Sequence, residues 1–509
     1  MRRAFDERPP SERSCAPPTV PLGLADLALE RRQQRVHLRF GRCPCPQTQL
    51  DRPRACMFGR QAVVLWSKSG CIFQNLALEE WFLQRCAREQ GPSRALLLYC
   101  NAPTVVIGRN QNPWVESNLW LLAQNEAGRG AHPETQEPVC LARRYSGGGT
   151  VVHDYGNLNF SFITPKTGFS RRKHIEWLAN TLQETFPDLQ LVINERNDLL
   201  CRGHKVSGSA YRLTGSAALH HGTLLVRSNL CQLRQFLSST QLHQATDQEQ
   251  MLTDIATSAT KRVAKAPHGV AFDLARETLS SSVAERNLST VGAHVHAAFS
   301  AVRGTASVRS PVMNLAEVVP CMQVNQVARV CFERFQTECS ARVVSSNEID
   351  WSSVRETATQ LLDPEWILGE TPAFQVHLPG LRLGHGVTVD AVLSALRKGA
   401  WLDSVALQAV DVLAEEQIVL KALQHMVEQH LQGRCRLDGA EIRTLLQQWN
   451  RLPNRSSDKR ARDCLEALGD ILARCLPPIH GWLRNQRTRV LGKTFSGQSM
   501  APVPSPSSG

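Results

Sequence analysis

The sequence predicts an α/β (α+β) protein in which a mixed sheet with its helices forms a larger domain and a smaller C-terminal domain follows. From residue 61 onward, short aliphatic runs alternate with segments that have apolar residues at helical spacing. At 509 residues the chain is long for one domain, and 42% of its residues are hydrophobic, enough for more than one core. After residue 371 the pattern begins again, with strand-like segments followed by helical ones.

The larger domain contains alternating strand and helix signals. We expect a helix over 71–89 and another over 171–186, which Pro187 must stop because proline cannot continue helical hydrogen bonding. A tight turn is expected at 202–203. Short aliphatic and aromatic runs predict strands at 62–66, 95–100, 104–107, 157–163, 189–193 and 199–201.

The C-terminal domain is expected to be a small sheet followed by helices. Its strands are predicted at 374–378 and 385–389, and its helices at 413–432, 438–449 and 458–475. The predicted organisation is a leader at 1–60, a catalytic domain at 61–371, an accessory domain at 372–485 and a disordered tail, rich in proline and serine, at 486–509.

The first 60 residues differ in charge from the rest of the chain. They carry twelve arginines, no lysine and six acidic residues, and so supply +6 of the formal net charge of +12. An arginine-rich, lysine-free leader is typical of a mitochondrial transit peptide, although six acids and many prolines are unusual in one. We therefore expect a cleaved leader and location in the mitochondrial matrix. The alternative is a disordered basic tail that binds nucleic acid.

Two segments interrupt the expected domains. Residues 124–138 form a long loop, and residues 241–300 form an insert rich in Ala, Ser, Thr and Gln without a strong apolar face. Because a structureless segment of that size is rare inside a compact domain, we expect the insert to lie outside the core.

The cysteines and the hydropathy favour an intracellular protein that does not span a membrane. Sixteen cysteines are scattered without a C-x-x-C pair, which favours reduced thiols in an intracellular compartment. No apolar run approaches the roughly 20 residues needed to span a bilayer. The expectation is a soluble protein without a membrane span.

Residues 143–157 carry three consecutive glycines between a basic pair and a β-branched run, RRYSGGGTVVHDYGN. Because glycine has no Cβ, such a turn lets backbone N–H groups approach a ligand closely. Val151 and Val152 favour a strand that would hold the turn. The spacing excludes a Walker loop and a G-x-G-x-x-G turn, but an ordinary glycine-rich hairpin fits equally well. His153 is either a ligand contact or a structural histidine bonded to the backbone of Asp154.

A second motif places Lys205 at the start of a strand beside Ser207 and Gly208. These small residues leave space for the ammonium, and a lysine there can hold an acyl carbonyl or a phosphate as a compact charge. A single lysine after a turn is commonly a solvated surface residue. The surrounding small residues and the His-His-Gly-Thr sequence at 220–223 favour a binding role.

In combination, these motifs resemble the lipoate–protein ligase and lipoyltransferase family. The resemblance covers residues 72–240 and 301–480, and residues 111–114 and 365–366 look most like the mitochondrial lipoyltransferases (lipoyl amidotransferases) of that family. The matching segments are FQNLALEEW at 73–81, VIGRNQNPW at 106–114, the triple-glycine motif, KVSGSA at 205–210, TASVRS at 305–310 and WILGETP at 366–372.

The resemblance implies the mixed-sheet catalytic fold of the biotin and lipoate protein ligases, with an accessory domain that can reorient over the acyl site. Lys205 would be the catalytic residue, whose cation neutralises acyl-phosphate oxygens or a developing oxyanion. Val152 stands where the family often has an aromatic residue, a change that would widen the acyl slot. The residues implied around the acyl group or acyl-adenylate are Arg144, Gly149, Thr150, Val151, Val152, Lys205 and Thr223, with Arg196, Val308 and Ser310 near the nucleotide end.

The implied activity is that of an acyltransferase that moves a lipoyl or octanoyl group onto a specific lysine. The acceptors would be the lipoyl domains of 2-oxoacid dehydrogenase acyltransferase subunits. The donor would be the lipoyl-lysine of the glycine-cleavage H protein or lipoyl-AMP. No tightly bound cofactor, metal or nucleic acid is expected.

Two other functions stay open. One is an ATP-dependent lipoate–protein ligase that activates free lipoate with ATP and magnesium, for which Asp198 could hold the metal. The other is a non-catalytic binding protein that keeps the fold. The presence of Lys205 with an intact triple-glycine motif argues against the latter, and the sequence at 111–114 favours the transferase over the ligase.

Overall fold

The structure is a computed structural model, and the residues it describes belong to one compact unit, Cys56–Gly509. The expected leader, most of the loop at 124–138 and most of the insert at 241–300 lie outside the described residues. Those residues are 61–88, 91–124, 137–237, 298–300, 304–395, 401–410, 414–450 and 459–494.

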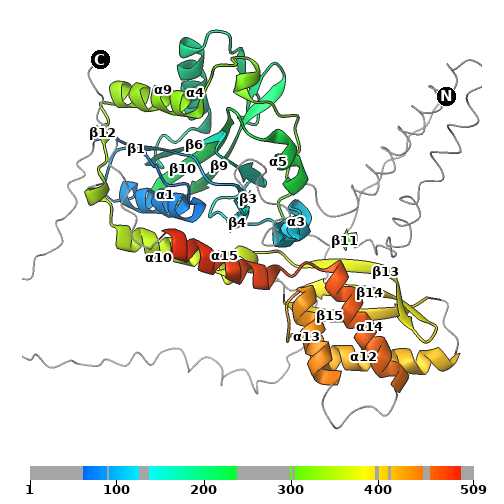
Figure 1. Cartoon of the computed structure of the whole chain (residues 1–509). Coiled ribbons are helices and arrows are strands. Elements are labelled where there is room, and N and C mark those ends of the chain that lie inside the picture. Colours follow the sequence, from blue (N-terminus) through cyan, green and yellow to red (C-terminus); the bar gives the residue numbers. More distant parts are fainter. Residues whose placement is uncertain are drawn as a thin grey trace, which may run out of the picture. The chain divides into compact units, whose positions relative to one another are not determined.

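A mixed sheet forms the centre of the larger domain (Figure 1). Strand β1 (Val63–Trp66) pairs in parallel with β2 (Ala95–Tyr99) and with β12 (Arg342–Val343), whereas the other neighbours are antiparallel. In the described residues the order is β12-β1-β2-β6-β10-β9-β8-β7, with β6 at Asn157–Pro165, β7 at Leu191–Ile193, β8 at Leu199–Cys201, β9 at His204–Leu213 and β10 at Ala217–Leu225. The mixed sheet expected from the sequence is confirmed.

Helices cover both faces of this sheet (Figure 1). Strand β2 is an uninterrupted apolar run because its side chains enter two cores, with Leu97 and Tyr99 in one and Leu96 and Leu98 in the other. The first core also contains α1 (Ile72–Cys86) and α10 (Trp351–Leu361), and the second contains α4 (Arg171–Thr185) and α9 (Val324–Glu338). Short helices lie at α2 (Pro113–Glu116), α3 (Leu119–Ala123), α5 (Leu230–Leu237) and α11 (Pro364–Gly369).

A small sheet carries the triple-glycine motif. Its central strand β3 (Thr104–Ile107) pairs in parallel with β4 (Cys140–Arg143) and antiparallel with β5 (Val151–His153). Residues 146–150, the glycine loop, connect β4 to β5. The two flanking strands therefore fix both ends of this loop.

The C-terminal domain is an antiparallel sheet with helices. In β14 (Val387–Ala395) buried and half-buried positions alternate strictly, which is typical of a strand that packs one face on a core. The sheet order is β11 (Ala298–Ser300), β13 (Phe374–Gly384), β14, β15 (Leu402–Ala409), and its helices are α12 (Ala414–Leu431), α13 (Gly439–Asn450) and α14 (Lys459–Cys475). The last helix, α15 (Ile479–Thr494), instead lies against α3 and α11 of the larger domain (Figure 1). No helix in the described ranges has the length and apolar character that crossing a membrane requires.

Two expectations for the C-terminal domain need correction. The strand expected at 385–389 begins at Val387, because Gly384, His385 and Gly386 have positive φ angles and form the turn of the β13–β14 hairpin. The sequence pattern also gave no strand at 402–409, where β15 forms the edge of the sheet.

Two boundaries also differ from the expected ones. The tail expected from residue 486 is wrong as far as Thr494, since α15 continues through this stretch and Gln486 is fully buried. The last residues of the insert, Ala298–Ser300, form β11 and pair with β13 at the edge of the C-terminal sheet. A boundary set by composition misses such contacts because they depend on distant partners.

Candidate functional site

A cavity of about 630 Å³ opens between the glycine loop and strands β9 and β10. One wall is backbone, formed by residues 147–149. Apolar side chains, Leu76 and Val106, line another part, and the charged side chains in the lining are Arg144, Arg171, Arg196, Asp198 and Lys205. A concave space of this size with both apolar and charged walls can hold a small ligand that has an acyl chain and a charged end.

Arg144 supports the glycine loop from within the protein. Its Nη2 atom donates hydrogen bonds of 2.7 Å to the carbonyl oxygens of Gly147 and Gly149. Gly148 between them has a φ of 85°, a left-handed conformation that glycine adopts without steric cost. Burial lowers the pKa of Arg144 to about 10, so the guanidinium stays charged at neutral pH. Arg144 thus lines the cavity while it bonds to loop carbonyls.

Arg143, at the end of β4, connects the same loop to the segment at 366–372. This side chain is fully buried, and its Nε atom donates to the carbonyl oxygen of Ile367 at 2.6 Å. Its Nη2 atom donates to Oγ1 of Thr371 at 2.9 Å. The indole of Trp366 donates back to the Arg143 carbonyl at 2.9 Å. Two of the motifs found in the sequence therefore form one hydrogen-bonded unit.

Lys205 lies at the start of β9 and lines the cavity. Its Nζ atom is 2.9 Å from Oδ1 of Asp198, and the two side chains are 20% and 9% exposed. A Cβ at Gly208 would lie 3.0 Å from Cε and 3.2 Å from Nζ of Lys205. Glycine at position 208 therefore leaves the space that the lysine occupies, as the small residues in the sequence indicated.

The segment at 305–312 packs against the loop and against β9. Oγ of Ser307 accepts hydrogen bonds from the Thr150 backbone at 2.9 Å and from Nε2 of Gln111 at 3.0 Å. Oγ1 of Thr150 donates to Oε1 of Gln111 at 2.9 Å. The backbone N–H of Lys205 donates to the Pro311 carbonyl at 2.8 Å. Motifs that are far apart in the sequence thus meet around the same cavity.

Two of the predicted binding residues do not line the cavity. Val152 packs into the hydrophobic core because successive side chains of β5 point to opposite faces, so the expectation that it lines or widens the acyl slot is wrong. Ser310 is also absent from the lining, since the chain after Val308 leaves the cavity to run beside the start of β9. The predicted residues that line it are Arg144, Gly149, Thr150, Val151, Arg196, Lys205, Thr223 and Val308.

Asp198, the candidate metal ligand, also lines the cavity. Its carboxylate is occupied by the ion pair with Lys205. Within the described part of the chain, no cluster of three or more His, Cys, Asp or Glu side chains is placed to hold a metal ion.

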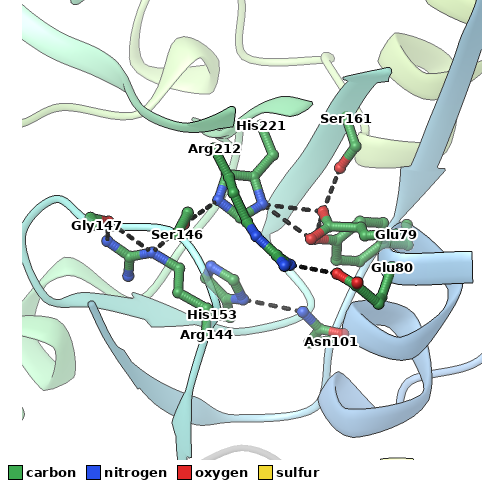
Figure 2. A network of polar contacts seen from close by, with 11 residues as sticks. Glu79, Glu80, Asn101, Arg144, Ser146, Gly147, His153, Ser161, Arg212 and His221 are labelled. Carbon is green, nitrogen blue, oxygen red and sulfur yellow. Dashed lines mark hydrogen bonds and ion pairs between the residues drawn. The ribbon is translucent and has the colours of Figure 1, made fainter. Parts of the chain in front are cut away.

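A buried polar network that was not predicted from the sequence lies at the cavity wall (Figure 2). Glu79 of α1 accepts hydrogen bonds from Tyr99 at 2.8 Å, from Ser161, and from Nδ1 of His221 at 3.0 Å. The Nε2 atom of His221 lies 2.7 Å from Oγ of Ser146. Burial alone would raise the pKa of Glu79, but the charge of His221 and the three donors outweigh it and lower the pKa.

A second chain of buried hydrogen bonds ends at His153. Nδ2 of Asn75 donates to Asn101 at 2.8 Å, and Nδ2 of Asn101 lies 2.9 Å from Nδ1 of His153. His153 lines the cavity and is bonded to Asn101, not to the backbone of Asp154. Asn75 and Glu79 are four residues apart on one buried face of α1, and this polar pair within an apolar helix was the available sequence signal.

Parts of the chain are similar in sequence to known proteins. Residues 71–267 match the sequence family described as the lipoyl protein ligase A/B catalytic domain. Mouse (Mus musculus) lipoyl amidotransferase LIPT1, mitochondrial, is 39% identical over 178 residues, which cover 35% of this chain and 44% of that protein. A putative lipoate-protein ligase A of Schizosaccharomyces pombe is 27% identical over 340 residues, 66% of this chain and 79% of that protein.

The crystal structure of P. falciparum LipL1 in complex with lipoate aligns with 81% of this chain and 99% of its own. The TM-score is 0.42 at 19% identity.

A part of the chain, residues 71–267, is therefore similar to the lipoyl protein ligase A/B catalytic domain. The chain is similar to proteins named lipoyl amidotransferase and to proteins named lipoate-protein ligase A. The match to the mouse amidotransferase spans less than half of that relative's length.

Proposed function

We propose that this protein transfers a lipoyl or octanoyl group onto the ε-amine of a specific lysine in a lipoyl domain. The observation that carries the proposal is the position of Lys205, whose ammonium lines a cavity walled by the backbone of residues 147–149. The cavity provides space for a medium-chain acyl group, and the ammonium provides a positive charge where the carbonyl or phosphate end would lie.

With lipoyl-AMP as donor, the acceptor amine attacks the acyl carbonyl carbon and forms the new C–N bond. The C–O bond to AMP breaks, AMP leaves with its phosphate charge, and the amine loses a proton. Lys205 stabilises the negative charge that develops on the oxygens during this step. No protein nucleophile is needed, because AMP is already a good leaving group.

With a lipoyl-lysine donor, one amide bond replaces another. The acceptor amine attacks the donor carbonyl, the bond to the donor lysine nitrogen breaks, and that nitrogen gains a proton. The same cavity and the same cation serve this reaction. The glycine-cleavage H protein would be the donor, and the lipoyl domains of 2-oxoacid dehydrogenase acyltransferase subunits would be the acceptors.

A mitochondrial matrix location is part of the proposal. It is supported by the arginine-rich, lysine-free composition of residues 1–60 and by the name of the mouse relative, which is a mitochondrial protein.

A comparison of donors tests the proposal. Purified protein is incubated with a lipoyl domain and one of three donors: lipoylated H protein, lipoyl-AMP, or free lipoate with ATP and magnesium. We expect modification of the acceptor lysine from the first two, measured by mass spectrometry. Efficient modification from free lipoate with ATP would assign the ligase function instead. Absence of transfer from all three would leave a binding protein that keeps the fold.

A further inference from the structure

The buried network of Figure 2 contains a chain of hydrogen bonds between Arg144 and Glu79. Nε of Arg144 donates to Oγ of Ser146 at 3.0 Å. The Nε2 atom of His221 lies 2.7 Å from the same Oγ. Because Glu79 is an acceptor, Nδ1 of His221 must carry the hydrogen that the carboxylate receives. The chain therefore joins Arg144, Ser146, His221 and Glu79.

This chain joins two buried charges of opposite sign. Arg144 is 5% exposed and Glu79 is 2% exposed, so neither is compensated by solvent. A buried charge is costly unless an opposite charge or hydrogen bonds satisfy it. The carboxylate of Glu79 is thus the counter-charge that lets the guanidinium stay charged where it binds the loop carbonyls of Gly147 and Gly149.

We propose that Glu79 is a positioning residue for the glycine loop, acting through His221 and Ser146 on the Arg144 guanidinium. Glu79 is not among the residues that line the cavity, so its effect on a bound donor is indirect. The chain holds the Ser146 side chain and the guanidinium in place, and the guanidinium bonds to the carbonyl oxygens of Gly147 and Gly149. The inference rests on the proposed function, because it assigns the loop to the acyl donor.

The network supplies a matched pair of serines for a test. Ser146 and Ser161 are both buried, and both bond within the network that ends at Glu79. Only Ser146 lies in the chain toward the loop, whereas Ser161 bonds to Glu79 from β6. Changing either serine to alanine removes one hydroxyl from the same network. A purely structural role of the network predicts similar effects for the two changes.

The kinetic test measures lipoyl transfer from lipoyl-AMP to a lipoyl domain as the donor concentration varies. We expect Ser146→Ala and Glu79→Gln each to lower kcat/KM about tenfold, whereas Ser161→Ala, which leaves the chain from Glu79 to Arg144 intact, lowers it less. Since both changes break one chain, the double variant should be no worse than the poorer single variant. Equal kinetics for the two serine variants, or multiplied losses in the double variant, would overturn the inference.

A second readout needs no donor. The N–H groups of Arg109 and Thr150 are bonded to the Ser146 carbonyl and to Ser307, so their hydrogen exchange reports on the order of the loop. We expect faster exchange in Ser146→Ala and Glu79→Gln, and wild-type exchange in Ser161→Ala. The same exchange in all of these proteins would contradict the inference.

The two readouts separate failure of this inference from failure of the proposed function. If the wild type transfers no acyl group, the proposed function fails. The hydrogen-exchange data then decide alone whether the hydrogen bonds between Glu79 and Arg144 order the glycine loop. If Ser146→Ala does not fold, Glu79→Gln is compared with Ser161→Ala, with the same expected and contradicting results.

Discussion

The ammonium of Lys205 and the carboxylate of Asp198 form an ion pair with a separation of 2.9 Å at the cavity wall. The carboxylate limits the positions that the flexible lysine can adopt, and Gly208 leaves it the space to reach the cavity. A donor that carries a phosphate then meets a charge that is already placed, which lowers the cost of ordering the site.

Asp198→Asn tests whether this carboxylate serves the lysine or a metal ion. If it only positions Lys205, transfer from lipoyl-AMP should fall about tenfold, because an ion pair is replaced by a neutral contact. Any reaction with free lipoate and ATP should fall by the same factor. Loss of the ATP-dependent reaction alone, with normal transfer from lipoyl-AMP, would show that Asp198 binds magnesium.

Gly208→Ala should reduce activity without unfolding the protein. The new methyl group would lie 3.0 Å from Cε of Lys205, and the flexible end of the lysine would move away from its place. We expect a fall in kcat of about tenfold, since small displacements of a catalytic group are costly. Gly215→Ala is the control, because a Cβ there meets nothing within 4 Å. Equal activity of the two variants would show that the position of Lys205 does not matter.

His153 should make the protein less stable in acid. Burial lowers its pKa to about 3, with the nearby charge of Arg144 adding to the effect. Its folded pKa is thus below the unfolded value of about 6.5. Between these two pH values only the unfolded state takes up the proton. The contribution of neutral His153 to the free energy of unfolding is therefore complete above pH 6.5 and is lost as the pH is lowered toward 3.

The measurement is the free energy of unfolding between pH 6 and pH 4. His153→Gln should make its decline shallower by about 1.4 kcal/mol per pH unit. A wild-type slope in His153→Gln would contradict the assigned pKa.

Gln486 is expected to stabilise the small sheet. Its Oε1 accepts from the Leu141 N–H at 2.8 Å, and its Nε2 donates to the Leu141 carbonyl at 3.0 Å, as a neighbouring strand would. Gln486→Ala leaves two backbone groups without partners and should cost about 1–3 kcal/mol in urea unfolding. Gln429→Ala, at an exposed position of α12, is the control. No difference between the two would refute this role.

Much of the fold could be predicted from the sequence because the elements are locally encoded. Helix α4 stops at Thr185, just before Pro187, and the turn at Arg202 and Gly203 has the positive φ angles of a tight hairpin. The strand β11 and the helix α15 could not be placed in the same way. Each depends on a distant partner, β13 for one and Leu141 for the other.

The candidate site was predictable where a motif needs glycine because a Cβ would not fit, as at the glycine loop and at Gly208. Val152 was predicted to line the acyl slot together with Thr150 and Val151. Side chains of a strand alternate between its two faces, however, and the side chain of Val152 packs in the core. The partnership of Glu79 with His221 was missed because the two residues lie far apart in the sequence, on α1 and β10, and no spacing motif links them.

Lys205→Ala tests the central claim most directly. Lipoyl transfer to the acceptor lysine is followed by mass spectrometry with lipoyl-AMP and with lipoylated H protein, and Lys421→Ala, at an exposed position of α12, is the control. Removing the cation should lower kcat on the order of 100- to 1,000-fold with each donor that the wild type uses, while Tm stays near that of the control. Transfer by Lys205→Ala at the wild-type rate would contradict the account.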